Sequence, residues 1–282
     1  MKAGLVTFYH IHHYGALLQA AATERAVERF GWDCEIIDYF VNQDNALFKR
    51  PTGLGSAAHD AHTALHYQAL SERYRRFEKF SRDHLRISDR RYGRFDELAE
   101  GPLPYDLILS GSDQIWNPQI FPDGRFDPVF FGAFSDRRHI AYAPSFGIPH
   151  IPTDMEEELR GYLARFSHLS VRERQGQKIV AGITGQDVPV VLDPTLLLTA
   201  DQWDSMADHP ANYPKGGYIL CYCISRPGAL IPYLERLHQE TGLPVVQLCG
   251  IRQKVHPKAK QIMDAGPAEF LGLFQNAAYV VT

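Results

Sequence analysis

The chain has 282 residues, which is long enough for two domains with cores of their own, because a domain usually takes roughly 100–200 residues. Hydrophobic residues make up 45% of the chain and charged residues 22%, the balance of an ordinary soluble globular protein. The formal net charge of −4 gives no reason to expect a nucleic-acid partner. No apolar run reaches the ~18 residues that a membrane-spanning helix requires.

Two features of the sequence predict a cytoplasmic protein. Residues 1–8 resemble a first strand rather than a signal peptide, since their apolar part is short and no cleavage site follows. The four cysteines are too sparse for a disulfide framework and lack metal-ligand spacing, so we expect buried thiols.

The first part of the chain alternates predicted strands and helices. The expected strands are residues 2–8, 34–39, 106–109, 138–143, 169–171 and 188–192. The expected helices are residues 15–30, 67–85, 154–166 and a further helix that begins after Glu173. Residues 42–66 show no clear period and are interpreted as an insertion.

Prolines and glycines with little apolar periodicity mark residues 199–216 as a linker. Strands at 217–224, 244–248 and 278–281 then alternate with helices at 229–241 and 267–275. The alternation predicts an α/β protein with a parallel sheet in each half. We therefore expect a first domain at 1–198, the linker at 199–216, and a second domain at 217–282 that is too small to be complete.

Polar side chains gather where the strand at 106–109 ends. Gly111 permits close approach of a substrate to the backbone, and Ser112, Asp113, Gln114 and Asn117 offer polar groups. Trp116 is interpreted as an apolar wall or a platform for a sugar ring. The alternative is a polar turn with Trp116 in the core; for the whole stretch we favour a site.

Other predicted strands end in the same way. The strand at 138–143 runs into Ser145, Phe146 and Gly147, and the strand at 169–171 runs into Arg172 and Glu173. Val188 to Leu192 leads into Asp193, for which we expect a structural role. Ligands of open α/β sheets usually bind beyond the carboxyl ends of the strands, so we expect these residues to converge on one crevice.

Five motifs in this order resemble the polysaccharide pyruvyl transferase family. They are Tyr14-Gly15-Ala16-Leu17-Leu18-Gln19, Gly111-Ser112-Asp113-Gln114-Ile115-Trp116-Asn117, Ala141-Tyr142-Ala143-Pro144-Ser145-Phe146-Gly147, Ser170-Val171-Arg172-Glu173 and Val191-Leu192-Asp193-Pro194-Thr195. The resemblance implies two Rossmann-like domains in a glycosyltransferase-B-like arrangement. It also implies transfer of pyruvate from phosphoenolpyruvate to a sugar of a surface polysaccharide or its precursor, forming a cyclic ketal.

The sequence departs from the family pattern at two places. His13 stands where the family commonly has Asn before Tyr-Gly. Similar members carry a Ser-Phe-His-Gly-like stretch just beyond the last strand, and its His is thought to contact the donor or act as an acid. The chain reaches Thr282 about where that stretch begins, so we expect a truncated second domain.

Phosphoenolpyruvate carries a phosphate and a carboxylate, so its site needs fixed cations. Arg172 is the predicted anion clamp, which matches the arginine of the family motif; the alternative is a salt bridge with Glu173 or Asp193. Asp113 is the predicted catalytic base or a ligand of sugar hydroxyls. Its alternative role is to order the loop by accepting N–H bonds from Gln114 or Ile115.

The predicted substrate-binding residues surround these two catalytic candidates. They are His13, Tyr14, Gly15, Gly111, Ser112, Gln114, Trp116, Asn117, Ser145, Phe146, Gly147 and Glu173. We expect no metal, because His10, His12 and His13 on one short loop cannot easily all face one ion. No cofactor is expected besides the donor substrate phosphoenolpyruvate.

Two other functions fit the same architecture. One is a glycosyltransferase of the glycosyltransferase-B type that uses a sugar nucleotide. The other is a catalytically silent binding module. A carbohydrate acceptor linked to a lipid would add peripheral contact with a membrane.

Overall fold

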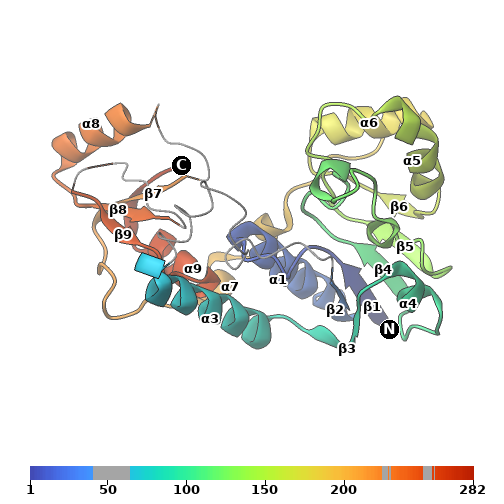
Figure 1. Ribbon diagram of the computed structural model, residues 1–282, viewed down its shortest axis with the longest axis horizontal. Coiled ribbons are helices and arrows are strands. Elements are labelled where there is room, and N and C mark those ends of the chain that lie inside the picture. Colours follow the sequence, from blue (N-terminus) through green and yellow to red (C-terminus); the bar gives the residue numbers. More distant parts are fainter. Residues whose placement is uncertain (41–63, 224–227, 229, 250–255, 257) are drawn as a thin grey trace. The chain divides into compact units, whose positions relative to one another are not determined.

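The computed structural model describes residues 1–40, 64–223, 228, 230–249, 256 and 258–282 (Figure 1). The chain forms two compact units. Unit 1 comprises Met1–Asn45 and His84–Thr199, and unit 2 comprises Ala46–Asp83 and Ala200–Thr282. The chain thus enters unit 2 twice. The grouping of residues 46–83 with unit 2 is not part of the predicted division, whose boundaries stay a prediction.

Unit 1 contains a six-stranded sheet in the order β3-β2-β1-β4-β5-β6. All five strand pairs are parallel. The strands are β1 (Lys2–Val6), β2 (Asp33–Tyr39), β3 (Ile87–Tyr92), β4 (Leu107–Ser110), β5 (Arg138–Ala141) and β6 (His168–Leu169). Every residue of the central strand β4 is buried, as expected for a strand covered on both faces.

The helices of unit 1 are α1 (Tyr14–Glu28), α4 (Phe95–Ala99), α5 (Glu156–Leu163) and α6 (Arg174–Thr184). Helix α1 begins at the predicted loop because the imidazole Nδ1 of His13 accepts a hydrogen bond from Ala16 N. Helix α6 ends at Gly185, whose φ of 74° suits the left-handed conformation of a helix end.

One strand of unit 1 is absent from the predicted elements and one predicted strand does not form, each for an identifiable physical reason. Strand β3 is absent from the predicted elements because it is a charged edge strand whose middle residues are exposed, so it lacks an apolar run. Residues 188–192 form only an isolated bridge between Val190 and Val171 instead of a strand. Pro189 has no backbone N–H to donate, and Val190 and Leu192 stay exposed.

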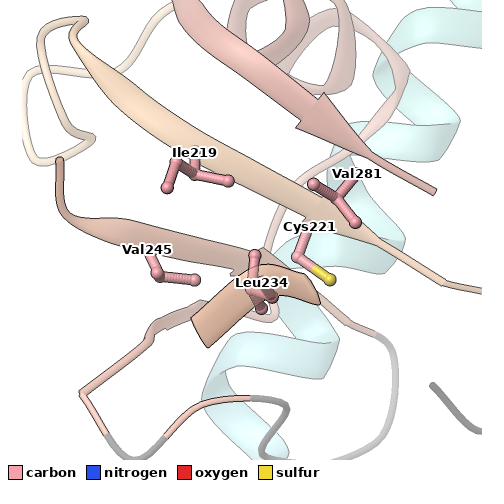
Figure 2. Close-up of a cluster of buried hydrophobic side chains, with 5 residues drawn as sticks. All are labelled: Ile219, Cys221, Leu234, Val245 and Val281. Atoms are coloured by element: carbon pink, nitrogen blue, oxygen red, sulfur yellow. The ribbon is translucent and has the colours of Figure 1, made fainter. Parts of the chain in front are cut away.

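Unit 2 contains a second parallel sheet in the order β10-β7-β8-β9. Its elements are α3 (Tyr67–His84, except for its last residue), α7 (Ala200–Asp204), β7 (Tyr218–Tyr222), α8 (Ile231–Thr241), β8 (Val245–Leu248), β9 (Lys260–Ile262), α9 (Pro267–Gln275) and β10 (Ala277–Val281). Figure 2 shows the core of this unit, where Leu234 of α8 packs over Ile219, Cys221, Val245 and Val281 from the strands. Helix α7 lies within the predicted linker.

The four cysteines are free thiols, as predicted. Cys34, Cys221 and Cys249 are buried, and Cys223 is partly buried. Burial raises the pKa of Cys249 to about 11, so this thiol stays protonated at neutral pH. Among the residues whose structure is described, no helix is long and apolar enough to cross a bilayer.

Candidate functional site

The predicted site segments lie side by side at one edge of the first sheet. Strands β4, β5 and β6 are adjacent and parallel, so their carboxyl ends meet at the same edge. Asp113 forms a bridge with Pro144, and Ser145 N donates to Asp113 O at 2.8 Å. Arg172 N donates to Pro144 O at 3.3 Å. Backbone contacts therefore bring these segments together, whereas their convergence on one crevice stays a prediction.

The backbone is strained at the ends of two of these strands. Asp113 has a φ of 71° and Ala143 a φ of 55°, in the left-handed region that residues with a Cβ rarely adopt. Such residues cost of order 1–3 kcal/mol each and cluster at functional sites, where the surrounding structure holds them. The strain marks this edge as a candidate site.

The carboxylate of Asp113 orders its own loop and keeps one oxygen available. Oδ1 accepts a hydrogen bond from Gln114 N at 2.8 Å, which is the loop-ordering role weighed above. No described residue hydrogen bonds to Oδ2, and the residue is only partly buried. Asp113 is therefore placed to accept a further hydrogen bond from a ligand.

Glu173 joins the loop after β5 to the start of α6. Its Oε1 accepts from Ser145 Oγ at 3.1 Å and from Phe146 N at 3.2 Å. Gly147 follows with a φ of 62°, and a Cβ there would lie 2.3 Å from Gln114 Oε1. That oxygen also accepts from Asn117 Nδ2 at 2.9 Å. Only glycine fits where these two loops meet.

Arg172 makes the ion pair that was the alternative interpretation of its role. Its Nη1 lies 3.0 Å from Asp193 Oδ2, and its Nε lies 4.0 Å from Glu173 Oε2. Asp193 is itself fixed, because its Oδ1 accepts from both N and Oγ1 of Thr195. The Arg172 side chain is 26% exposed, so the guanidinium is oriented by carboxylates and still reaches solvent.

A concave surface of about 620 Å³ surrounds Arg172. Its lining is mainly apolar and consists of Tyr142, Arg172, Val190, Val191, Leu192, Asp193 and Leu197. Val190 and Leu192 are exposed although they are apolar. A single cation in such surroundings suits a small anionic ligand that also carries apolar atoms.

Several predicted binding residues are buried and support the loops instead of facing solvent. Trp116 is 0% exposed, stacks on Phe131 at 5.0 Å between ring centroids, and donates from Nε1 to Phe130 O. Ser112 is also 0% exposed and donates from Oγ to Ala143 O at 2.9 Å. Phe146 and Tyr14 are buried too. Trp116 therefore lies in the core and presents no ring face to a sugar.

Gly111 packs the sheet instead of admitting a ligand. A Cβ there would lie 2.8 Å from Leu5 Cδ1 and 3.0 Å from Thr7 Cβ. Thr7 Oγ1 also donates to Ser112 O at 3.2 Å and accepts from Gln19 Nε2 at 2.8 Å. These bonds tie the end of β1 and helix α1 to the loop after β4. Thr7 is not among the residues predicted from the sequence, and its position directly after a strand is the signal that could have indicated it.

His13 and Gly15 are exposed at the start of α1. The imidazole of His13 caps the helix, and a Cβ on Gly15 would lie 3.2 Å from His13 Cε1. Within the described part of the chain, no group of three or more His, Cys, Asp or Glu residues is arranged to hold a metal ion.

A likeness to a known structure supports the glycosyltransferase-B-like fold class. The chain is similar to an alpha-glucosyltransferase solved in complex with UDP, with 7% identity and a TM-score of 0.51 over 99% of this chain and 72% of that chain. A UDP-GlcNAc 2-epimerase from Methanocaldococcus jannaschii also aligns, with 14% identity and a TM-score of 0.44 over 99% of this chain and 78% of that chain. The first likeness shows the fold alone, and with the two parallel sheets it confirms the predicted pair of Rossmann-like domains.

The family assignment comes from the sequence as a whole. The family described as polysaccharide pyruvyl transferase matches residues 13–282, nearly the entire chain, and includes all five quoted motifs. The chain therefore belongs to the polysaccharide pyruvyl transferase family, which confirms the resemblance. Among curated proteins there is no match. Membership implies a transferase of polysaccharide biosynthesis with a small-molecule donor and a polysaccharide acceptor.

Proposed function

We propose that this protein transfers pyruvate from phosphoenolpyruvate to a sugar of a surface polysaccharide or its precursor, as a cyclic ketal. Family membership supports a pyruvyl transferase. The observation that carries the proposal is the convergence of the segments of Asp113, Ser145 and Arg172 at one sheet edge. A small anionic donor needs a cation to bind it, and a hydroxylic acceptor needs a base such as a carboxylate.

In this proposal Arg172 binds the donor. Its planar guanidinium matches a phosphate or a carboxylate bidentately, and Asp193 and Glu173 hold it in orientation. The apolar lining beside it, Val190 and Leu192 among others, accommodates the methylene group of the donor. The phosphate or the carboxylate of the incoming donor would compete with Asp193 for the guanidinium of Arg172.

Asp113 is the proposed base. Two sugar hydroxyl oxygens form bonds to C2 of the enolpyruvyl group, the bond from C2 to the phosphate oxygen breaks, and the methylene carbon gains a proton. Of the two hydroxyl protons, one balances the new methyl group and the other leaves with inorganic phosphate. Asp113 Oδ2, which no described side chain occupies, accepts a hydroxyl proton in the transition state.

In this proposal the remaining predicted residues hold the loops of the site in position. Ser145, Gly147 and Glu173 shape the loop beside Arg172, while Gln114 and Asn117 fix the loop that carries Asp113. His13 and Gly15 are the exposed predicted residues at the start of α1. The proposed reaction takes place in the cytoplasm, which the free thiols support, and uses no resident cofactor besides the donor.

The proposal is tested by incubating the purified chain with phosphoenolpyruvate and a polysaccharide preparation from its source. We expect release of inorganic phosphate together with a new ketal methyl signal in the proton NMR spectrum of the polymer. Release of a nucleoside diphosphate from a sugar nucleotide, with no consumption of phosphoenolpyruvate, would instead indicate a glycosyltransferase. Binding of the polysaccharide without turnover of either donor would indicate a binding module.

The role of Arg172 is tested by Arg172→Ala. Loss of a charge-assisted, bidentate contact costs about 1.5–3 kcal/mol, so we expect the Michaelis constant for phosphoenolpyruvate to rise at least tenfold. Arg138→Ala is the matched control. Arg138 is exposed and lies at the amino end of β5, whereas the proposed site lies beyond the carboxyl ends of the strands. An unchanged Michaelis constant in a folded Arg172→Ala variant would remove Arg172 from the donor site.

A further inference from the structure

A second group of polar and aromatic side chains lies at the carboxyl ends of β1 and β2, outside the site around Asp113 and Arg172. It consists of Tyr9, His10, Asp38, Phe40 and Arg91 and is called the Asp38 cluster below. Oδ1 of Asp38 accepts from Tyr9 OH at 2.5 Å and lies 3.0 Å from His10 Nε2. Oδ2 accepts from Arg91 Nε at 3.0 Å. None of these residues is among the predicted site residues.

Asp38 fixes the orientation of the His10 ring. Burial by itself raises the pKa of Asp38, but the hydrogen bonds from His10, Tyr9 and Arg91 outweigh it and lower the pKa to about 2. The carboxylate is therefore ionised at neutral pH and acts only as an acceptor, so Nε2 of His10 carries a hydrogen. Nδ1, the other ring nitrogen, then remains for a hydrogen bond with a ligand. No described residue hydrogen bonds to Nδ1, and the ring is 22% exposed.

An aromatic ring beside His10 reaches the surface. Phe40 is 36% exposed, and its ring meets the His10 ring edge-on at 5.1 Å between centroids. The guanidinium of Arg91 lies 5.8 Å from the Phe40 ring centroid, and the Tyr9 ring lies 3.8 Å from that of His10. A partly exposed aromatic ring next to oriented hydrogen-bonding groups suits a sugar, which has apolar C–H faces and hydroxyls at its rim.

The Asp38 cluster lies near the proposed reaction site. In the sheet, β2 neighbours β1, and β1 neighbours β4, the strand that leads to Asp113. Neighbouring strands are about 4.8 Å apart, so the ends of β2 and β4 are roughly 10 Å apart, with the end of β1 between them. The bond from Thr7 Oγ1 to Ser112 O holds the ends of β1 and β4 together.

We propose that the Asp38 cluster is the subsite for the acceptor sugar, which rests on the function proposed above. A pyranose lies with an apolar face against the exposed part of Phe40, and one of its hydroxyls forms a hydrogen bond with Nδ1 of His10. Asp38 is a positioning residue that fixes the His10 ring, and Tyr9 and Arg91 hold Asp38. The two reacting hydroxyls of the same sugar then extend towards Asp113.

The test uses two variants and two matched controls of the full chain. Phe40→Ala removes the aromatic face. His10→Gln keeps an N–H donor for Asp38 and removes Nδ1. Phe30→Ala and His168→Gln are the controls. Phe30 is 82% exposed, and His168 belongs to β6, the edge strand on the side of the sheet away from β2. Thermal melting establishes that each variant is folded.

Sugar binding is measured by saturation-transfer NMR with methyl β-D-galactopyranoside and methyl α-D-glucopyranoside, and donor binding by calorimetry with phosphoenolpyruvate. We expect at least a fivefold loss of affinity for the bound glycoside in Phe40→Ala and His10→Gln, none in the controls, and unchanged donor binding. Wild-type affinity in both variants, or saturation transfer to neither glycoside, overturns the subsite. Glycoside binding through the cluster without any binding of phosphoenolpyruvate would refute the proposed function and leave the subsite standing.

Discussion

At the scale of single residues, the most unusual carboxyl group of the first unit lies away from the site. Glu24 of α1 is 3% exposed, and both of its carboxyl oxygens lie 3.1 Å from Arg86 N. Burial raises its pKa to about 8, although the hydrogen bonds from Arg86 N lower it. The folded protein therefore holds Glu24 protonated at neutral pH, whereas the unfolded chain ionises it.

This difference predicts a pH dependence of stability. From pH 4.5 to about 8 the unfolded chain loses the Glu24 proton while the folded protein keeps it, so Glu24 lowers stability as pH rises through this window. We expect Glu24→Gln to raise the free energy of unfolding by roughly 1–3 kcal/mol at pH 8 and by less at pH 5. Urea unfolding at both pH values measures this, with the exposed Glu100→Gln as control. An equal effect at the two pH values would contradict the assignment.

Gly132 and Gly124 offer a matched pair for separating backbone strain from steric overlap. Both have positive φ, 65° and 68°. A Cβ on Gly132 would lie 2.1 Å from Cδ2 of the buried His139, whereas no described atom lies within 4 Å of a Cβ on Gly124. We expect Gly124→Ala to cost about 1–2 kcal/mol of unfolding free energy and Gly132→Ala about 2 kcal/mol more. Equal melting temperatures for the two variants would show that His139 moves aside freely.

At the scale of elements, helix α3 is joined to the rest of the second unit by the ion pairs of Arg76 and by the packing of Leu70 against Met263. Nη1 of Arg76 donates to Tyr213 OH at 2.7 Å and lies 3.1 Å from Asp264 Oδ2. Its Nε lies 3.0 Å from Glu72 Oε1 and 3.3 Å from Glu269 Oε1. The Arg76 side chain is 15% exposed and that of Glu269 is 7% exposed, so these ion pairs are largely shielded from water. This attachment accounts for the grouping of α3 with unit 2.

Removal of that arginine leaves buried carboxylates without their cation. We expect Arg76→Ala to lower the unfolding free energy of unit 2 by about 3–5 kcal/mol, because breaking one side of a buried ion pair is strongly destabilising. Arg75→Ala is the control, since Arg75 is the next residue on the same helix and its side chain is 74% exposed. Chemical unfolding followed by hydrogen exchange assigns the loss to a unit. Similar unfolding curves for Arg76→Ala and Arg75→Ala would show that Arg76 does not hold helix α3 to the second unit.

Elements differ in how well the sequence predicts them. Helix α9 has the predicted bounds, because Pro267 opens it and its Glu269 caps Gly266 N. The charged edge strand β3 is missed because solvent on one side removes the need for apolar residues. Residues 188–192 are apolar and still form no strand, since hydrophobic content alone does not supply a neighbouring strand.

At the scale of the whole molecule, the sheet order explains why the meeting of the strand ends was predictable, whereas the site itself stays a prediction. Parallel strands place their carboxyl ends along one edge, so polar residues after β4, β5 and β6 meet once the order is known. Membership of the pyruvyl transferase family was likewise readable from motifs along the chain. The grouping of residues 46–83 with the second unit was not, because the contacts of α3 are made by residues more than a hundred positions later.

The amino-acid sequence by itself determined the α/β class, the parallel sheets, the family and the strand ends that carry polar residues, because periodicity and motif order are local properties. Only the tertiary structure decided which of those residues face solvent. Trp116 and Ser112 belong to the same motif as Asp113, yet Phe130, Phe131 and Ala143 enclose them and leave one carboxylate oxygen of Asp113 free of described partners. The Asp38 cluster also became visible only in the fold, because burial and side-chain contacts arise from segments that the chain brings together across long separations.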